Sequence, residues 1–245
     1  MENNLDRSLC ITWYDLPEKD RGAHLEWLHG SFIPRQLKKP GMLWAAHYLC
    51  ERQPDPVHKV LHYADEPVPA GNDYILLFGA ETAHAFAPPA PGRSDTTVTD
   101  ADRALLAQRR EARINVFTEE ACVDGPEAAR RKRGAELSAC IQLGSFNTRS
   151  YQDEDGLMAW YAHNRLPGLA RTPGCIGVRK LVSVSGWAKH GVLYEFTSKE
   201  DRDKYFRAYE NADPAMAAWT DSLRRSLVHA PGSANVAYRV WPPVG

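Results

Sequence analysis

One stretch of sequence occurs twice in this 245-residue chain at a constant spacing. Each copy holds a tryptophan, two prolines and a glycine, and every residue of the second copy lies 133 positions after its counterpart, without a gap. The first copy has Trp27, Pro34, Pro40 and Gly41, and the second has Trp160, Pro167, Pro173 and Gly174. A chain that repeats such a pattern is expected to use one structural unit twice.

Each copy predicts the same series of elements. An amphipathic helix that contains the tryptophan leads to a proline-marked bend, a Pro-Gly turn and then a β-rich run. With the flanking segments, each half follows the order β-α-β-β-α-β, which is the split β-α-β unit of the ferredoxin-like fold. The fold class predicted is therefore α+β, with two ferredoxin-like units in tandem, each an antiparallel sheet with helices on one face.

The boundaries of the elements follow from apolar periodicity and from turn residues. Residues 1–125 are the first unit, with inserts at 50–72 and 87–98; residues 126–136 are a charged linker with helical character; and residues 137–245 are the second unit. The expected strands are 9–14, 42–49, 73–79, 114–118, 137–146, 175–184, 191–197 and 235–241. The expected helices are 17–38, 81–86, 99–113, 153–170, 198–209 and 214–229.

Composition limits the class of partner and the compartment. The 30 basic and 31 acidic residues give a net charge of −1, which argues against nucleic acid or an anionic membrane as a partner. The five cysteines are odd in number and lie far apart, so they favour neither a disulfide framework nor a zinc site. Without a basic, apolar leader or a membrane-length apolar run, the chain is expected to be cytoplasmic.

The second copy carries a pattern that points to a known family. Trp160-Tyr161 leads to Leu166-Pro167-Gly168-Leu169 and then to Pro173-Gly174. This pattern resembles the dimeric α/β-barrel superfamily, nearest its EthD-like branch. The resemblance implies that the two units pair sheet against sheet into one barrel within the chain, with the helices outside.

The same resemblance leaves the reaction open. The superfamily includes cofactor-free monooxygenases, lactone isomerases, polyketide cyclases and, in tandem form, haem proteins. Many relatives have a histidine two residues before the motif proline, but that position holds Phe32 in one copy and Arg165 in the other. His29 and His163 lie nearby on other positions of the helix, so no mechanism transfers by alignment.

The strand after each Pro-Gly turn offers the first candidate residues. Because side chains alternate along a strand, Trp44, Ala46 and Tyr48 are expected on one face and His47 on the other. His47 is suited to move protons near neutral pH, Tyr48 lies beside it, and Arg179 in the second copy could hold an oxyanion or pair with Glu195. The alternatives for His47 and Arg179 are structural strand positions.

Further candidates come from the repeated helices and from the first insert. His29 and Tyr161 lie one turn from the motif aromatics. In the first insert, His58 is a further candidate catalytic residue. His58 and His62 also have the i, i+4 spacing of a weak metal site, although no metal is expected. The insert resembles a lid over a first-half pocket. Substrate-contacting aromatics are predicted at Trp13, Trp27, Trp44 and Phe78.

These features favour a cofactor-independent acid–base enzyme for a hydrophobic, aromatic or polyketide-like small molecule, acting as a lyase, isomerase, cyclase or monooxygenase. The absence of glycine-rich phosphate loops and of a Gly-x-Ser-x-Gly motif argues against nucleotide and hydrolase chemistry. Two alternatives stay open: a haem protein with an axial histidine, and a non-catalytic small-molecule-binding protein. A homodimer is compatible with all three.

Overall fold

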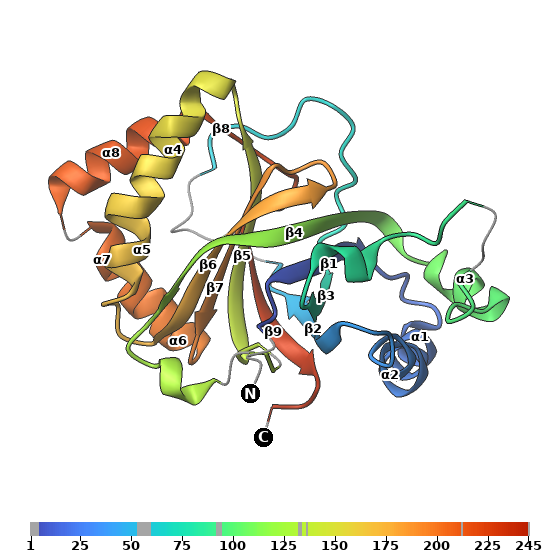
Figure 1. Ribbon diagram of the computed structural model, residues 1–245. Helices are drawn as coiled ribbons and strands as arrows, with labels where there is room; N and C mark the ends of the chain where they lie inside the picture. Colours follow the sequence, from blue (N-terminus) through green and yellow to red (C-terminus); the bar gives the residue numbers. More distant parts are fainter. Residues whose placement is uncertain are drawn as a thin grey trace.

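The computed structural model describes residues 5–52, 60–91, 95–131, 134–135, 137–211 and 213–244. Antiparallel strands form a closed barrel in this part of the chain, with β8 attached as an additional short strand (Figure 1). The order of pairing is β7-β6-β4-β1-β3-β2-β9-β5, and β5 pairs with β7 to close the ring. The predicted barrel fold is therefore confirmed.

The first half contributes four barrel strands: β1 (Ser8–Asp15), β2 (Met42–Cys50), β3 (Tyr74–Ala80) and β4 (Arg110–Asp124). Its helical segments are α1 (Arg21–Trp27), η1 (Leu28–Phe32), α2 (Ile33–Gln36), η2 (Ala83–Phe86) and α3 (Asp100–Leu106). A short 3₁₀ turn, η3 (Ala128–Arg130), follows β4.

The second half contributes β5 (Cys140–Thr148), β6 (Cys175–Ser185), β7 (His190–Phe196) and β9 (Asn235–Trp241), together with β8 (Leu227–His229). Its helical segments are η4 (Tyr151–Asp153), α4 (Glu154–Trp160), η5 (Tyr161–Arg165), α5 (Leu166–Leu169), α6 (Lys199–Asp201), η6 (Arg202–Phe206), α7 (Arg207–Asn211) and α8 (Pro214–Arg224).

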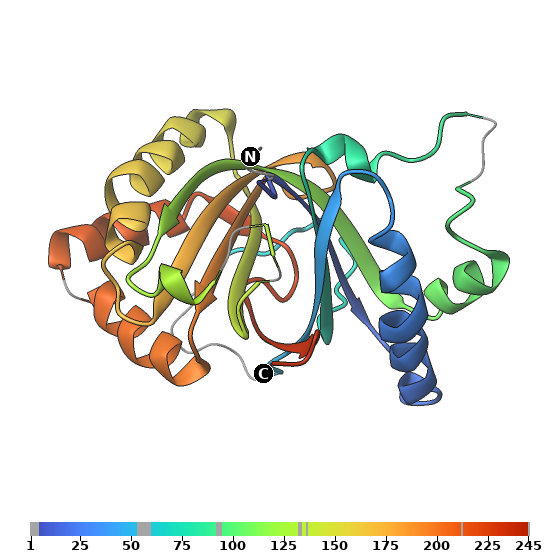
Figure 2. The ribbon, with the colours of Figure 1, turned by 60° about the horizontal axis from the view of Figure 1, so that its bottom comes forward.

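The two halves have the same strand order and join at two equivalent seams. The first half is ordered β4-β1-β3-β2 and the second β9-β5-β7-β6. The last barrel strand of each half pairs with the second strand of the other, since β4 pairs with β6 and β2 with β9. Figure 2 shows the helices of the two halves on opposite sides of this barrel.

Three apolar clusters follow from the alternation of side chains along the strands. One cluster draws residues from every barrel strand of both halves, including Trp13, Tyr48 and Leu193, and fills the barrel interior. The other two lie between sheet and helices, one in each half. The strands β1, β2, β3, β5 and β7 are therefore buried on both faces over most of their length, whereas β4 keeps an exposed outer face. Polar groups on the buried faces need partners within the protein.

A π-helical turn precedes the motif proline in both copies. The turn η1 ends one residue before the dipeptide Ile33-Pro34, and η5 stands at the same place before Leu166-Pro167. Proline has no backbone N–H to donate, and the N–H of the residue before it reaches back five positions, from Ile33 to the carbonyl of Leu28. The predicted proline bend is thus a change of helical repeat within one continuous helix.

Two predicted helices end earlier than expected. The helix predicted for 99–113 stops at Leu106, and Arg110–Arg113 instead extend β4 alongside β1. The helix predicted for 214–229 stops at Arg224, after which β8 pairs with β5. In both cases the sheet satisfies the backbone groups of residues with adequate helix propensity, so tertiary pairing overrides the local pattern.

Candidate functional site

The second strand separates its side chains between barrel interior and helix layer as predicted. Trp44, Ala46 and Tyr48 belong to the interior cluster, whereas Ala45 belongs to the helix-facing cluster of the first half. His47 shares the face of Ala45 and is fully buried. It therefore points toward α1 and η1, away from Tyr48.

His47 is the centre of a chain of hydrogen-bonded ionisable side chains. Its Nε2 lies 2.9 Å from the hydroxyl of Tyr14 on β1, and its Nδ1 lies 2.8 Å from Nε2 of His29 on η1. Tyr74 on β3 stacks on the His47 ring with 5.2 Å between centroids. Trp241 stacks on His29 at 5.9 Å. Four strands (β1, β2, β3 and β9) and one helical turn thus fix the chain His29–His47–Tyr14.

Burial sets the protonation of this chain. Tyr14 and His47 have no solvent exposure, and His29 is half-buried at the outer end. Desolvation lowers the pKa of His29, and together with the charges of His29 and Arg109 it lowers the pKa of His47 well below 6.5. The same burial raises the pKa of Tyr14 to about 12. At neutral pH both imidazoles are neutral and the phenol is protonated.

Two further buried polar side chains, Arg109 and His24, lie beside this chain. The guanidinium carbon of Arg109 lies 4.2 Å from the centre of the Tyr14 ring. Within the described part of the chain, its buried Nε and Nη2 have no partner, while the guanidinium as a whole also interacts with the Tyr14 hydroxyl. The buried ring of His24 has the side chain of Gln108 as its polar neighbour. Burial and the charge of Arg109 lower the pKa of His24 to about 4. Unsatisfied buried polar groups are rare in native proteins and indicate an additional ligand or water.

Tyr48 and Arg179, the other two leading candidates, lie in the barrel interior. The hydroxyl of Tyr48 donates to the carbonyl of Ser138, 2.7 Å away. Arg179 donates to the carboxylate of Asp6 at 2.7 Å, and both side chains are about 2% exposed. Glu195, the partner considered for Arg179, instead pairs with Arg131 at 2.8 Å. The structure therefore brings His29 to His47 but places Tyr48 and Arg179 elsewhere.

The position equivalent to His47 in the second half holds a lysine whose hydrogen bonds are all made within the protein. Lys180 occupies the position of His47, and its ammonium contacts His190 and Glu120, both at 2.9 Å, and the carbonyl of Leu181. Tyr161, a predicted catalytic residue, lies in the same layer with its ring 5.2 Å from that ammonium. With three acceptors for three N–H groups, Lys180 is a structural cation.

The predicted substrate-contacting aromatics also divide between layers. Trp13 and Trp44 fill the barrel interior, where their indoles donate to Asn235 and Asp6. Phe78 and Trp27 belong to the helix-facing layer of the first half. Only the second pair shares the layer of His29 and His47.

The first insert contacts the second half along its described part. His62 and Ala64 pair through their backbones with His229 on β8, and the His62 ring lies 3.4 Å from Arg149. His58 falls outside the described residues. Among the described residues, no three His, Cys, Asp or Glu side chains come together as a metal site would need. No helix there has the length and apolarity needed to span a membrane.

Sequence reasoning missed Tyr14 and Arg109. Tyr14 lies in a predicted strand, and its pairing with Tyr74 could be inferred only from the register of β1 on β3. Arg109 was assigned to a helix, whereas it lies in the connection between α3 and β4. The signal for both depends on which strands become neighbours, because β1 pairs with β3 and with β4, and the local sequence pattern does not specify these pairings.

Comparison with known proteins supports the fold and leaves the reaction open. No protein-family model matches the sequence, and no relative was found among curated proteins. Among solved structures, the chain resembles an anthrone oxidase-like protein with a TM-score of 0.61 and 11% identity, covering 95% of this chain and 90% of that one.

Two more solved structures have the same arrangement. A candidate monooxygenase of Fusobacterium nucleatum gives a TM-score of 0.57 at 7% identity, with 95% of this chain and 92% of that one covered. A candidate monooxygenase of Lactobacillus acidophilus gives 0.51 at 9% identity, with the same coverage. The likeness extends over nearly the whole of each chain, and the protein therefore has the dimeric α/β-barrel fold, with both units supplied by a single chain.

Proposed function

We propose that the protein is a cofactor-independent enzyme that removes a proton from a hydrophobic aromatic ketone, and that its reaction is the oxidation of an anthrone-like compound. The hydrogen-bonded chain His29–His47–Tyr14 is the observation that carries this proposal. Its outer member is half-buried and its inner members are sealed from solvent. Such a chain is suited to accept a proton from a bound molecule while excluding water.

The geometry defines how a proton would be received. When His29 donates from Nε2 to Nδ1 of His47, and His47 donates from Nε2 to the Tyr14 oxygen, Nδ1 of His29 keeps its lone pair. This nitrogen can then take a proton from carbon, and the resulting imidazolium keeps its hydrogen bond to His47. The lowered pKa values of both histidines keep this base neutral and ready at neutral pH.

Arg109 supports the same step through charge. Removing a proton beside a carbonyl places negative charge on the carbonyl oxygen, and a desolvated cation stabilises that oxyanion. The unpaired Nε and Nη2 of Arg109 lie on one edge of the guanidinium and can donate together. We assign stabilisation of the oxyanion to Arg109 and removal of the proton to His29.

The oxygen step then needs no cofactor. The anthrone anion transfers electrons to dioxygen, one oxygen atom becomes the new carbonyl of the anthraquinone, and the other leaves as water with the two hydrogens of the former methylene. The fold likeness to an anthrone oxidase-like protein and to two candidate monooxygenases supports this choice over lyase or isomerase chemistry. We further propose an EthD-like ancestry and an origin by tandem duplication.

The proposal is tested with anthrone as substrate, by following dioxygen uptake and anthraquinone absorbance. His29→Gln and Arg109→Gln should each reduce kcat/KM by about 10²-fold or more, the usual contribution of a positioned base or an oxyanion donor. Tyr14→Phe should have a smaller effect because it removes only the end of the chain. Arg103→Gln, an exposed arginine of α3 that pairs with Asp100, is the matched control.

Anaerobic exchange of the anthrone methylene hydrogens in deuterated water separates proton removal from oxidation. The rate of exchange should fall with the same variants, and its acid limb should lie below pH 6.5 because the pKa of His29 is lowered. Wild-type protein that catalyses neither exchange nor oxidation would exclude the proposed reaction. Full activity in His29→Gln would exclude the assigned base.

The haem alternative needs a histidine nitrogen that is free to bind iron. His47 engages both ring nitrogens, with Tyr14 and His29, and is unsuited to that role. For the other histidines the alternative stays a prediction, and a Soret band in protein from haem-supplied cells would establish it.

A further inference from the structure

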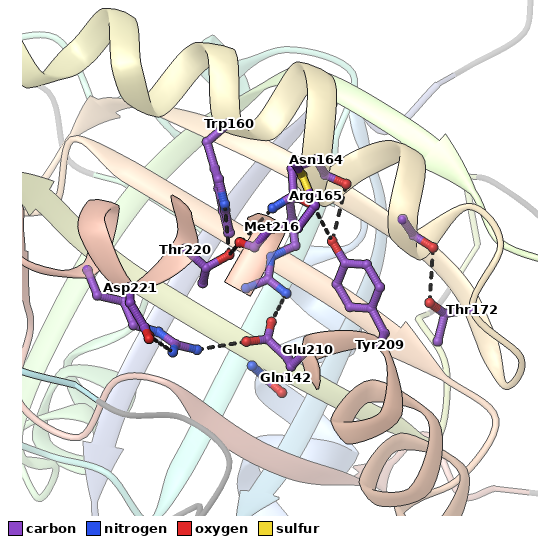
Figure 3. Close-up of polar contacts among 12 residues, drawn as sticks. Gln142, Trp160, Asn164, Arg165, Thr172, Tyr209, Glu210, Met216, Thr220 and Asp221 are labelled. Carbon is purple, nitrogen blue, oxygen red and sulfur yellow. Dashed lines mark hydrogen bonds and ion pairs between the residues drawn. The ribbon is translucent and has the colours of Figure 1, made fainter. Parts of the chain in front are cut away.

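A groove of about 490 Å³ opens in the second half, remote from the His29–His47–Tyr14 chain. It lies between the segment η5–α5 with its following turn and the segment η6–α7–α8. Figure 3 shows Asn164 and Thr172 from the first segment and Tyr209 and Met216 from the second. Its volume falls within the range of small-molecule sites.

The two halves differ at a repeated position that lines the groove. In the first half this position is Arg35, whose side chain reaches Ser31 and Asp102 and occupies the space between helices. In the second half it is Gly168, 133 residues later. A Cβ at Gly168 would overlap the Tyr209 ring, so the glycine allows the tyrosine to pack against the helix backbone.

The polar side chains on the floor of the groove form hydrogen bonds with one another. The hydroxyl of Tyr209 donates to the backbone and side-chain oxygens of Asn164, and the amide of Asn164 donates to Thr220. Glu210 forms ion pairs with Arg165 and Arg224, and Figure 3 shows the contact with Arg165. The floor therefore offers the ring of Tyr209 and the thioether of Met216 as its main contact surfaces, which favours an aromatic occupant.

The two sides of the groove carry exposed side chains of opposite charge. Arg171 lies in the turn after α5, and Asp213 is the N-cap of α8, where one carboxylate oxygen accepts from the backbone of Ala215 and Met216. Neither Arg171 nor Asp213 forms an ion pair with any other residue that the structure describes. His163 adds a third polar group on the side of Arg171.

We propose that this groove binds an aromatic α-amino acid as a zwitterion. The carboxylate is held by Arg171 and His163, the ammonium by Asp213, and the ring lies on Tyr209 and Met216. A ligand with charges of both signs at one end and an apolar ring at the other matches the two charged sides and the aromatic floor, whereas a simple anion or cation satisfies only one side.

Isothermal titration calorimetry with three matched probes tests the proposal. L-Phenylalanine carries both charges, phenethylamine lacks the carboxylate and 3-phenylpropionate lacks the ammonium. Phenylalanine should bind tightest, and each analogue should bind several-fold more weakly, roughly three- to tenfold, as expected for partly screened charge pairs. Equal affinity for all three probes, or no heat with any of them, would overturn the proposal.

Variants locate the binding. Arg171→Gln should reduce the affinity for phenylalanine several-fold and leave that for phenethylamine unchanged, while Asp213→Asn, which keeps a capping oxygen, should weaken phenethylamine and leave 3-phenylpropionate unchanged. Ala208→Trp should fill the groove from an exposed helix position and abolish binding of all three probes. Unchanged binding in Ala208→Trp would place the ligand elsewhere and contradict the proposal. Arg103→Gln serves as the surface control.

Discussion

The two motif tryptophans have the same architectural task with different acceptors. The indole of Trp27 donates to Asp102 on α3 at 2.9 Å, and that of Trp160 donates to Thr220 on α8 at 3.1 Å. The first bond joins the repeated helix α1–η1–α2 to α3, and the second joins α4–η5–α5 to α8. Asp102 is buried, yet hydrogen bonds from Thr99, Trp27 and Arg35 lower its pKa to about 2, so the acceptor of Trp27 is a charged carboxylate.

The difference between the acceptors predicts unequal costs of mutation. Trp27→Phe should reduce the free energy of unfolding by about 1–2 kcal/mol more than Trp160→Phe, because a hydrogen bond to a charged group contributes more than one to a hydroxyl. Phenylalanine retains an aromatic face at both positions, including the one that stacks on Arg165. Urea unfolding measures both variants; equal losses would contradict an ionised acceptor at Trp27.

At the scale of elements, the sequence predicted the features that depend on local residue pattern and missed those that depend on which strands pair. The repeat, the proline positions and the alternation of His47 and Tyr48 are local, and each predicted its element or face correctly. The end of α3 and the start of β4 depend on whether β1 is free to accept Arg110–Arg113 as a partner. The assembly of Tyr14, His47 and Arg109 depends on the same pairing, so only part of the site was predictable.

Glycines on the repeated helices test the packing between elements. A Cβ at Gly22 in α1 or Gly156 in α4 would meet nothing within 4 Å, whereas one at Gly168 would displace Tyr209. Gly22→Ala and Gly156→Ala should each stabilise the protein by about 0.5–1 kcal/mol, since alanine loses less backbone entropy in a helix. Gly168→Ala should instead destabilise it by about 1–3 kcal/mol through overpacking.

Thermal unfolding of the three glycine variants gives the comparison. A stabilised Gly168→Ala would show that Tyr209 can move away from the helix without loss of stability. A destabilised Gly156→Ala would show that the N-terminal turn of α4 is less regular than the structure indicates.

At the scale of the whole molecule, neither half is complete. The interior cluster takes residues from all barrel strands, and the seams β4–β6 and β2–β9 supply hydrogen bonds across the halves. A separated half would expose one face of its sheet and two unpaired edges, which favours association.

The two halves, expressed as residues 1–131 and 134–245, should each fail to form a monomer and should combine when mixed. Size-exclusion chromatography with light scattering would then show a 1:1 complex with far-ultraviolet circular dichroism close to that of the intact chain. A half that remains a folded monomer would show that the barrel interior contributes little to its stability.

The filled barrel also decides how two reactions or ligands in this protein could communicate. Trp13, Trp44 and Tyr48 lie packed within it, and the proposed active site and the groove lie on its outer faces, one on each side. Because these side chains fill the barrel interior in the described part of the chain, a product of the proposed reaction is expected to reach the groove through bulk solvent and not through the barrel.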